Sequence, residues 1–201
     1  MRKLISLLTV LCCFGIMKAQ IHQHNGFYLS MGLGPAFGSI TDKSSSFDFT
    51  YSGTGAEFDF KIGGAIKENL ILHATLDSKS IMGPTIASGS NSGTASSNVS
   101  ISESILGVGL TYYFMPINFL VSGSIGLGYY NLTDPDHNLN VTTQTGFAFQ
   151  LKIGKEWWVS NKWGLGVGIT YGKTNLTNSA EGISEDMDSN RFGILFNASF
   201  K

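Results

Sequence analysis

The chain has 201 residues, of which 42% are hydrophobic and only 13% are charged. That charged share is about half of what soluble globular proteins usually carry. Twenty-five glycines against four prolines, with 12% aromatic residues, favour many strands over a helical bundle. The formal net charge of −1 argues against a nucleic-acid partner, and the length suits one domain with its own core.

The first twenty residues have the composition of a secretory signal peptide. Two basic residues precede an apolar run from Leu4 to Met17, and the small residue Ala19 follows. This run is short for a membrane span, and no later segment approaches the roughly 20 apolar residues that a helical span requires. We expect cleavage between Ala19 and Gln20, so that residues 1–19 are the signal peptide and residues 20–201 form one β-barrel domain.

Both cysteines, Cys12 and Cys13, lie inside this signal, so we expect a mature chain without disulfides. A lipoprotein signal would place a small residue before the acylated cysteine, whereas Leu11 precedes Cys12. We therefore expect no lipid anchor, and stability must come from the sheet.

From Phe27 onward, apolar residues alternate with polar residues or glycines, the period-2 pattern of strands whose two faces differ. The pattern predicts about eight strands, the small end of the range for membrane barrels. They are Phe27–Phe37, Gly53–Ile66, Leu70–Ile81, Val99–Phe114, Phe119–Leu132, Gly146–Val159, Trp163–Asn175 and Arg191–Phe200. In the fourth, Ile101, Glu103 and Ile105 have the opposite parity to the later apolar residues, which predicts a bulge or register flip.

The connections between these segments alternate between long and short. The short ones are 67–69, 115–118 and 160–162, and the long ones are 38–52, 83–98, 133–145 and 176–190. Short periplasmic turns and long outer loops are typical of outer-membrane barrels. The predicted fold is therefore all-β, a single antiparallel up-and-down transmembrane β-barrel. Its four long connections are rich in Ser, Thr, Asn and Gly, so we expect mobile, solvated loops.

Alternation alone does not say whether the apolar residues face lipid or the barrel interior. Eight strands enclose a space just wide enough for side chains to fill, which suits glycine, serine and a few charged residues. Aromatic residues also gather near predicted strand ends, where membrane barrels carry aromatic girdles. These residues are Tyr112, Phe114, Tyr129, Trp157, Trp158, Trp163 and Tyr171. We expect the apolar face to contact lipid; a soluble periplasmic barrel with a hydrophobic ligand is the weaker alternative.

The sequence resembles the eight-stranded outer-membrane β-barrels of the OmpA/OmpX type. OmpW-like and PorT-like proteins are among them. The features that carry this resemblance are the signal peptide, the alternating segments, the alternation of short and long connections, and the final stretch 192–200. The resemblance covers nearly the whole mature chain and is one of pattern, without a diagnostic motif. It implies an outer-membrane location and insertion by the barrel-assembly machinery, which in this family reads an aromatic residue ending the last strand. Phe200 matches that position, although Lys201 follows it.

The short turn at 67–69 predicts the register between the second and third strands. It sets three pairs opposite each other, namely Lys61 with Thr75, Asp59 with Asp77, and Glu57 with Lys79. The predicted lumen cluster of charged residues comprises Glu57, Asp59, Lys61, His73, Asp77, Lys79, Lys152, Glu156 and Arg191. Mixed charges in a closed lumen must pair, because a lone buried charge is costly. The cluster is interpreted as an ion-paired plug or, alternatively, as the lining of a narrow conduit.

We expect no enzyme activity, cofactor or metal site. Ser78 and Ser80 have the opposite parity to His73 and Asp77, so no nucleophile meets a base on one face. The stretch 134–138 begins like a calcium loop but lacks its glycine and closing glutamate, which predicts a polar turn. A last acidic stretch is predicted to be a solvated loop; it contains Glu181, Glu185, Asp186 and Asp188.

Two functions remain open. The first is a structural or interaction role, in which the barrel holds four loops outside and contacts outer-membrane lipid, lipopolysaccharide or an extracellular ligand. The second is passage of a small solute or hydrophobic molecule through the lumen or laterally into the bilayer, as the OmpW-like resemblance implies.

Overall fold

The computed structural model describes residues 23–44, 48–180 and 183–201. The predicted signal peptide, with its cleavage position between Ala19 and Gln20, lies outside the described residues. In chain order the elements are β1 (Phe27–Ser44), β2 (Asp48–Lys67), β3 (Leu70–Met82), β4 (Thr85–Ser88), β5 (Asn91–Thr94), β6 (Ser100–Phe114), β7 (Phe119–Asp134), the 3-10 helix η1 (Pro135–His137), β8 (Leu139–Thr142), β9 (Gly146–Trp158), β10 (Trp163–Ala180) and β11 (Ile183–Phe200). Among these residues, no helix is both long and apolar enough to cross a membrane.

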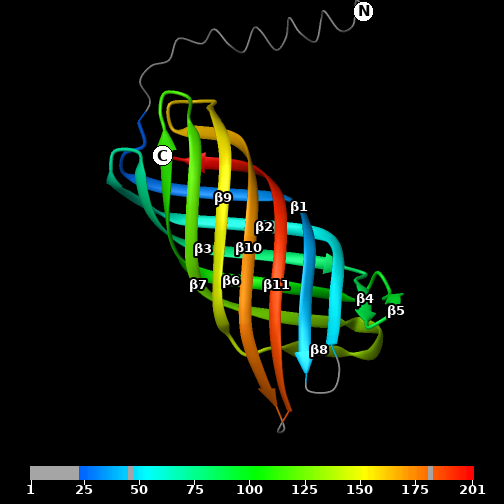
Figure 1. Ribbon diagram of the computed structural model, residues 1–201. Coiled ribbons are helices and arrows are strands. Elements are labelled where there is room, and N and C mark those ends of the chain that lie inside the picture. Colours follow the sequence, from blue (N-terminus) through cyan, green and yellow to red (C-terminus); the bar gives the residue numbers. More distant parts are fainter. Residues whose placement is uncertain (1–22, 45–47, 181–182) are drawn as a thin grey trace, which may run out of the picture.

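Eight of the strands close into a barrel, as Figure 1 shows. They pair antiparallel in the order β1-β2-β3-β6-β7-β9-β10-β11, and β1 pairs with both β2 and β11. Closure satisfies the backbone hydrogen bonds that an open sheet edge would leave exposed to lipid. The predicted antiparallel eight-stranded barrel is confirmed.

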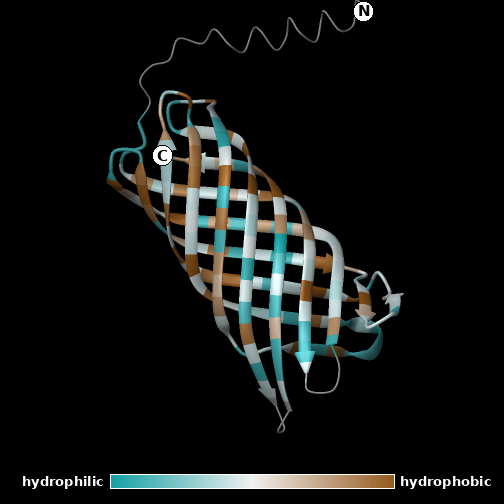
Figure 2. Cartoon of the chain, viewed as in Figure 1, coloured by the Kyte–Doolittle hydropathy of each residue, from teal (hydrophilic) through white to brown (hydrophobic). Residues whose placement is uncertain are grey.

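Side chains alternate between the outside of the wall and the lumen. On β10, Leu165, Val167 and Ile169 point outward with 49%, 40% and 55% of their surface exposed, whereas Thr170 is fully buried. In Figure 2, brown segments alternate with white and teal segments along the strands, as this alternation requires. On β10 the band from Trp163 to Tyr171 covers nine residues, which agrees with the roughly 9–11 residues that a tilted strand needs to cross a hydrocarbon core. The predicted outward orientation of the apolar face is confirmed.

The predicted register of β2 and β3 is also confirmed, although the turn differs in detail. The two strands pair as expected, with Lys61 opposite Thr75, Asp59 opposite Asp77 and Glu57 opposite Lys79. Lys67 pairs with Leu70, so the turn has two residues, and Asn69 adopts φ 63° there. A register shift between Ala65 and Lys67 adds the residue that the shorter turn omits, which leaves the rest of the register unchanged.

The prediction of a bulge or register flip in β6 is wrong. This strand pairs with β3 and β7 without a register shift, and its parity is constant from Ser100 to Phe114. Ile101 and Ile105 point into the lumen and are buried. The parity change in the sequence has another cause: one end of the lumen is lined by apolar instead of polar side chains.

The prediction that residues 38–52 and 176–190 form long loops is wrong, because both segments are mostly strand. β1 and β2 pair as far as Lys43 and Asp48, and β10 and β11 pair as far as Ala180 and Ile183. Apolar alternation marks only the part of a strand that faces lipid, so it missed strands that continue into water. Glu185, which was expected in a solvated loop with Asp186 and Asp188, therefore lies on β11 with them.

We call these strand ends the extension, which comprises residues 38–44, 48–54, 172–180 and 183–191. The β4–β5 hairpin pairs with β2 beside the extension, and β8 pairs with β7. The extension projects from the end of the barrel opposite to the short turns (Figure 1). By the pattern of outer-membrane barrels, that end is extracellular and the short turns are periplasmic.

Candidate functional site in the barrel lumen

All nine residues of the predicted lumen cluster lie inside the barrel, and none has more than 3% of its surface exposed. They come from β2, β3, β9 and β11, and they point inward because they occupy alternate positions of those strands. The charges are arranged in three layers along the barrel axis: one at the centre, one toward the extracellular end and one at the periplasmic mouth.

The central layer is built around the Asp59 carboxylate. Its Oδ1 accepts a hydrogen bond from Lys152 Nζ at 3.0 Å, and its Oδ2 pairs with the Lys61 ammonium and accepts from Gln150 Nε2 at 2.9 Å. Lys61 also donates to Gln150 Oε1 at 2.8 Å, and Lys152 donates to Asn197 Oδ1 at 2.9 Å. One carboxylate thus holds two lysines, and an amide oxygen accepts a second hydrogen bond from each of them.

Lys79 joins the other two central carboxylates. Its Nζ lies 2.5 Å from Asp77 Oδ2 and 3.2 Å from Glu57 Oε1, and the Thr170 hydroxyl donates to Glu57 Oε2 at 2.6 Å. Gly193 makes room for this carboxylate, since a Cβ there would lie 1.6 Å from Glu57 Oε2. The inward glycines therefore decide how much side chain the narrow lumen can hold.

Glu103 and Arg191 form the layer toward the extracellular end. Arg191 Nη1 lies 3.9 Å from Glu103 Oε2, and the Ser189 hydroxyl donates to Glu103 Oε1 at 2.7 Å. Glu103 is absent from the predicted lumen cluster because the parity change in its segment predicts a bulge there. A constant parity along β6 would have placed it inside.

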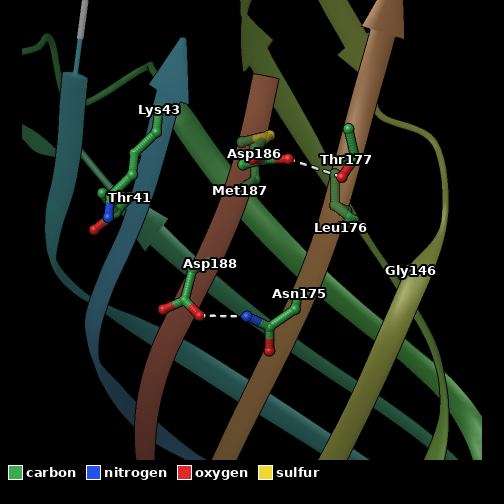
Figure 3. A pocket seen from close by; sticks show the side chains of 9 residues that line it. All are labelled: Thr41, Lys43, Gly146, Asn175, Leu176, Thr177, Asp186, Met187 and Asp188. Atoms are coloured by element: carbon green, nitrogen blue, oxygen red, sulfur yellow. Dashed lines mark hydrogen bonds between the residues drawn. The ribbon is translucent and has the colours of Figure 1, made fainter. Parts of the chain in front are cut away.

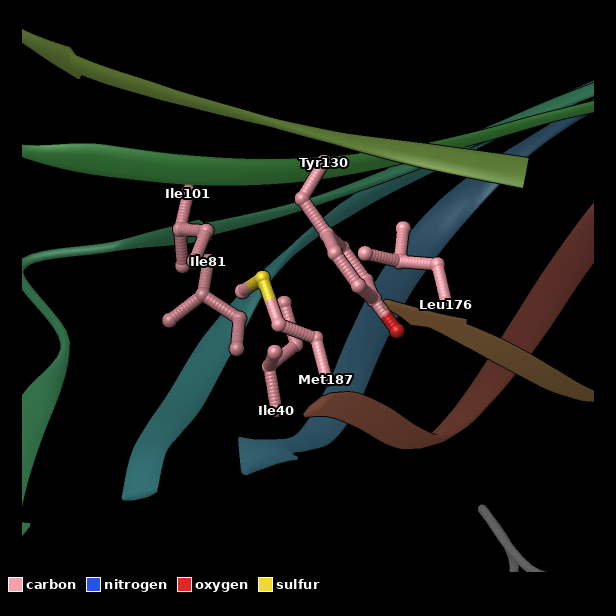
Figure 4. Close-up of a cluster of buried hydrophobic side chains, with 6 residues drawn as sticks. All are labelled: Ile40, Ile81, Ile101, Tyr130, Leu176 and Met187. Carbon is pink, nitrogen blue, oxygen red and sulfur yellow. The ribbon is translucent and has the colours of Figure 1, made fainter. Parts of the chain in front are cut away.

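An apolar cluster closes the lumen beyond this layer, where the extension begins. Figure 4 shows its six buried side chains, which come from six different strands. They are Ile40, Ile81, Ile101, Tyr130, Leu176 and Met187. The Tyr130 hydroxyl donates to the Thr174 carbonyl oxygen at 2.8 Å, so its polar end is satisfied inside the cluster.

The periplasmic layer centres on Glu156. Its carboxylate pairs with the Lys201 ammonium and accepts hydrogen bonds from Ser199 Oγ at 2.8 Å and from the Tyr113 hydroxyl at 3.3 Å. The Lys201 ammonium also lies 4.2 Å from the ring centroid of Tyr113 and 4.6 Å from that of Trp158. Lys201, which follows the terminal aromatic residue Phe200, therefore contributes to the lumen.

Residues before β1 cover the same mouth of the barrel. The His24 ring stacks on Tyr113 at a centroid distance of 3.6 Å, and its Nε2 lies 2.8 Å from Asn118 Oδ1. It also lies 5.1 Å from the Trp158 ring. The prediction that Trp158 belongs to the aromatic girdle is therefore wrong: it follows the outward Trp157 and takes the inner face.

The other predicted girdle residues lie at the two ends of the apolar band. Tyr112, Phe114, Trp157 and Trp163 surround the periplasmic rim and are 40% to 53% exposed. Tyr129 and Tyr171 lie on the outer face toward the extracellular end, where Tyr171 donates to Asn190 Oδ1 at 2.9 Å.

Charge is balanced within the lumen. Among the described residues between the apolar cluster and the periplasmic mouth, the inward carboxylates are Glu57, Asp59, Asp77, Glu103 and Glu156, and the inward bases are Lys61, Lys79, Lys152, Arg191 and Lys201. Carboxylates and bases are equal in number within each layer and in the lumen as a whole. A buried network of this kind holds itself together, because removal of either partner leaves an uncompensated buried charge.

His73 and Ser78 lie on opposite faces of the wall, as their parity predicts. His73 Nδ1 lies 3.0 Å from Thr75 Oγ1, and its Nε2 lies 2.9 Å from Thr111 Oγ1. Ser78 instead contacts Ser104 on the outer face at 3.3 Å. The histidine is enclosed by hydroxyl groups in the lumen, and the serine faces away from it.

A cavity of about 680 Å³ lies in the wall of the extension (Figure 3), where outward polar residues meet Leu176 and Met187 of the apolar cluster. Its lining residues are Thr41, Lys43, Gly146, Asn175, Leu176, Thr177, Asp186, Met187 and Asp188. Asn175 donates to Asp188 at 2.5 Å, and Thr177 donates to Asp186 at 2.8 Å. Lys173 pairs with Asp188 at 2.8 Å. Hydroxyl, amide, carboxylate and ammonium groups therefore lie side by side on the outer face of the extension.

The turn at 134–138 is a short capped helix. The Asp134 side chain accepts from the backbone N–H of Asp136 at 3.1 Å and pairs with His137 Nδ1 at 2.7 Å. This hydrogen bond raises the pKa of the His137 imidazole and lowers the pKa of the Asp134 carboxyl. The predicted polar turn is confirmed.

Comparisons with known proteins agree with this architecture. None of the curated proteins matches the chain. Neisserial surface protein A has a TM-score of 0.53 at 15% identity, over 84% of this chain and 96% of that one. The outer membrane protein OprG from Pseudomonas aeruginosa has a TM-score of 0.53 at 12% identity, over 90% of this chain and 99% of that one. At such identities the likeness concerns the fold alone.

The family model described as "Outer membrane protein beta-barrel domain" matches residues 6–200. Its match spans all eight strands of the closed barrel and the apolar band that surrounds them. The chain therefore belongs to the outer membrane protein beta-barrel family, whose members reside in the outer membrane of Gram-negative bacteria.

Proposed function

We propose that this protein is a non-catalytic, closed barrel that serves envelope structure and surface interaction. The observation that carries this proposal is the filled lumen, in which five carboxylates match five bases. An apolar cluster covers the network on the extracellular side, and His24, Trp158 and Lys201 cover it on the periplasmic side. An ion would have to break several buried pairs to cross this barrel.

The extension supplies the interaction surface. Its outer face continues the lipid-facing surface of the wall, so it rises through the layer where the headgroups and sugars of the outer leaflet lie. Phe37 is followed on that face by Ser39, Tyr171 by Lys173, and Phe192 is preceded by Asn190. Hydroxyl, amide and carboxylate groups can exchange hydrogen bonds with saccharides. Lipopolysaccharide is therefore the proposed partner of the extension.

Single-channel recording in planar bilayers tests the closed lumen. The wild-type barrel should give no steady conductance. The current recorded for Lys61→Ala should differ from that of the wild type far more than the current recorded for Ile62→Ala, a substitution of the neighbouring residue on the lipid face. A steady wild-type conductance whose ion selectivity changed with Lys61→Ala would contradict the plug. It would support the alternative, a narrow channel for small solutes.

Unfolding in urea, with and without lipopolysaccharide in the bilayer, tests the partner. The glycolipid should stabilise the wild-type barrel, since a ligand that binds only the folded state raises its stability. Asp188→Asn and Lys43→Ala should reduce this gain, whereas Phe196→Leu within the acyl band should not. An equal gain in all four proteins would contradict saccharide recognition by the extension.

Assembly in the membrane is the remaining part of the proposal. Phe200 pairs with Leu29 and Trp163 where the last strand closes the barrel, and its ring lies 5.4 Å from that of Trp163. We propose that Phe200 is the residue that the barrel-assembly machinery reads. Phe200→Ala should lower the heat-modifiable fraction in cells more than it slows refolding of the purified chain. Equal effects in both settings would indicate a packing role instead.

A further inference from the structure

A basic and aromatic patch lies on the outer wall at the periplasmic rim, over β9, β10 and β11. We call it the rim patch, and its members are Lys155, Trp157, Lys162, Trp163 and Phe200. A shallow, open depression forms part of it, lined by Ser160, Asn161, Lys162, Trp163 and Phe200. The rim patch is separate from the extension, which lies at the other end of the barrel.

Lys155 interrupts the apolar outer face of β9, where its outward neighbours along the strand are Ile153 and Trp157. A lysine on the lipid face is costly near the bilayer midplane, and the cost falls toward the interface. Lys155 reaches that interface: its ammonium donates to the Ile117 carbonyl oxygen in the β6–β7 turn and lies 5.6 Å from the Trp157 ring centroid. Its charge is therefore held at headgroup level.

Lys162 supplies a second positive charge from the β9–β10 turn. Its Nζ lies 5.7 Å from the Phe200 ring centroid. Ser160 Oγ holds the turn in place by accepting from the backbone N–H groups of Lys162 at 3.3 Å and Trp163 at 3.1 Å. Within the described part of the chain, neither Lys155 nor Lys162 forms an ion pair with a carboxylate.

The two ends of the barrel carry opposite charge, which indicates the kind of lipid that fits. The described carboxylates outside the lumen at the extracellular end are Asp42, Asp48, Asp134, Asp136, Glu185, Asp186 and Asp188, against Lys43 and Lys173. The periplasmic rim instead presents Lys67, Lys155 and Lys162 against Glu68. An anionic phospholipid headgroup is therefore favoured at the periplasmic rim over the opposite end, where only Lys43 and Lys173 offset the carboxylates.

We propose that the rim patch is a binding site for an anionic phospholipid of the inner leaflet. Lys162 pairs with the phosphodiester, and the Ser160 hydroxyl and Asn161 amide lie beside the glycerol. Lys155 adds a second positive charge at the same rim, on the side of the β6–β7 turn. Trp157, Trp163 and Phe200 contact the start of the acyl chains, the position at which interfacial aromatic residues are most favourable. The site fixes one lipid against one side of the barrel and orients the protein in the leaflet.

Native mass spectrometry of the folded full-length barrel tests this site. The protein in neutral detergent is titrated with phosphatidylglycerol or with phosphatidylethanolamine, and the retained lipid is counted. Phosphatidylglycerol should be retained more tightly. Lys162→Gln and Lys155→Gln should each weaken retention about fivefold, the fold-change expected for about one kcal/mol per basic residue. Lys67→Gln, elsewhere on the same rim, is the matched control and should have little effect.

Three results would overturn the proposal. Equal retention of both lipids by the wild-type protein would show that the patch does not select an anionic headgroup. Loss of retention in Lys67→Gln as large as in Lys162→Gln would show diffuse charge attraction without a site. Displacement of the lipid by an equal concentration of inorganic phosphate would also contradict a lipid site. Lys162 lies in an exposed turn, so its variant should fold normally, and heat-modifiability verifies this.

Discussion

The membrane-embedded part of the barrel and the extension use the same strands with their faces inverted. On β1 in the membrane, Ser30 points inward and Leu33 outward; beyond Gly38, Ile40 points inward and Lys43 outward. The parity of the strand is unchanged, but the inner face is polar in the membrane and carries an apolar residue in the extension, whereas the outer face changes from apolar to polar. The surroundings of the wall explain the difference, because the outer face meets lipid at one height and water at the next.

The inversion changes what stabilises each part. In the membrane, the apolar outer face gains little from packing because lipid is equally apolar, so cohesion of the lumen rests on paired charges and hydrogen bonds. In the extension, water surrounds the wall, and burial of the apolar cluster contributes in the usual way. Substitutions of the same chemical kind should therefore have different effects in the two parts.

The largest difference is expected for carboxylates. Asp59→Ala leaves two buried lysines without their shared partner and should lower the free energy of unfolding by about 3–5 kcal/mol. Asp186→Ala removes a carboxylate from the outer face of the extension and should cost less than about 1 kcal/mol. Urea titration in liposomes, followed by tryptophan fluorescence, measures both. Similar losses would contradict the contrast between a buried and a solvated carboxylate.

The next difference concerns arginine on the outer face of β10. Val167→Arg places the charge in the acyl region and should cost about 2–4 kcal/mol. Ser179→Arg introduces the same side chain on the same face, but in water, and should stay within about 0.5 kcal/mol. The same unfolding assay compares them. A large loss in Ser179→Arg would mean that the membrane reaches higher along the extension than the apolar band indicates.

A smaller difference in stability is expected between Ile→Val substitutions in the apolar cluster and on the lipid face. Ile81→Val removes a methylene from the apolar cluster at the extracellular end and should cost about 0.5–1.5 kcal/mol, because neighbouring side chains cannot fill the gap. Ile194→Val on the lipid face should be close to neutral, since mobile acyl chains fill the space. If both variants lost the same stability, lipid contacts would be as rigid as packing inside the cluster.

The smallest effect is a pH dependence confined to the extension. Burial, with contributions from Glu185 and Asp48, raises the pKa of the Asp42 carboxyl to about 6. The folded extension thus binds this proton more tightly than the unfolded chain does. Its contribution to stability is complete below about pH 4 and is lost as the pH rises through about 6. Asp42 is partly exposed, so the effect should be modest.

Carbon-13 NMR of the Asp42 carboxyl measures the midpoint directly. Amide protection at the β1–β2 tip, corrected for intrinsic exchange, should fall over the same pH range, and Asp42→Asn should remove the dependence. A midpoint near 4 in the wild-type protein would show that this carboxyl is solvated in the folded state.

Within the membrane, single-chain alternation was sufficient to predict much of the fold. The inward set on β2 and β3, and their register, could be derived because a slip of one residue would expose every charge to lipid. The same reasoning failed at Trp158 and Glu103. Trp158 was grouped with its aromatic neighbours instead of being assigned by parity, and Glu103 lies in a segment whose inner face is partly apolar.

By itself, the sequence determined the barrel, its strand order and most of the side chains that face the lumen across the acyl region, because lipid strongly favours apolar side chains on the outer face there. Only the tertiary structure decided where the strands end and how the lumen is closed. Beyond the acyl region either face of a strand can be polar, so alternation loses its meaning. The closure depends on side chains from distant strands that meet across the lumen, as Ile40 and Tyr130 do at one end and Glu156 and Lys201 at the other.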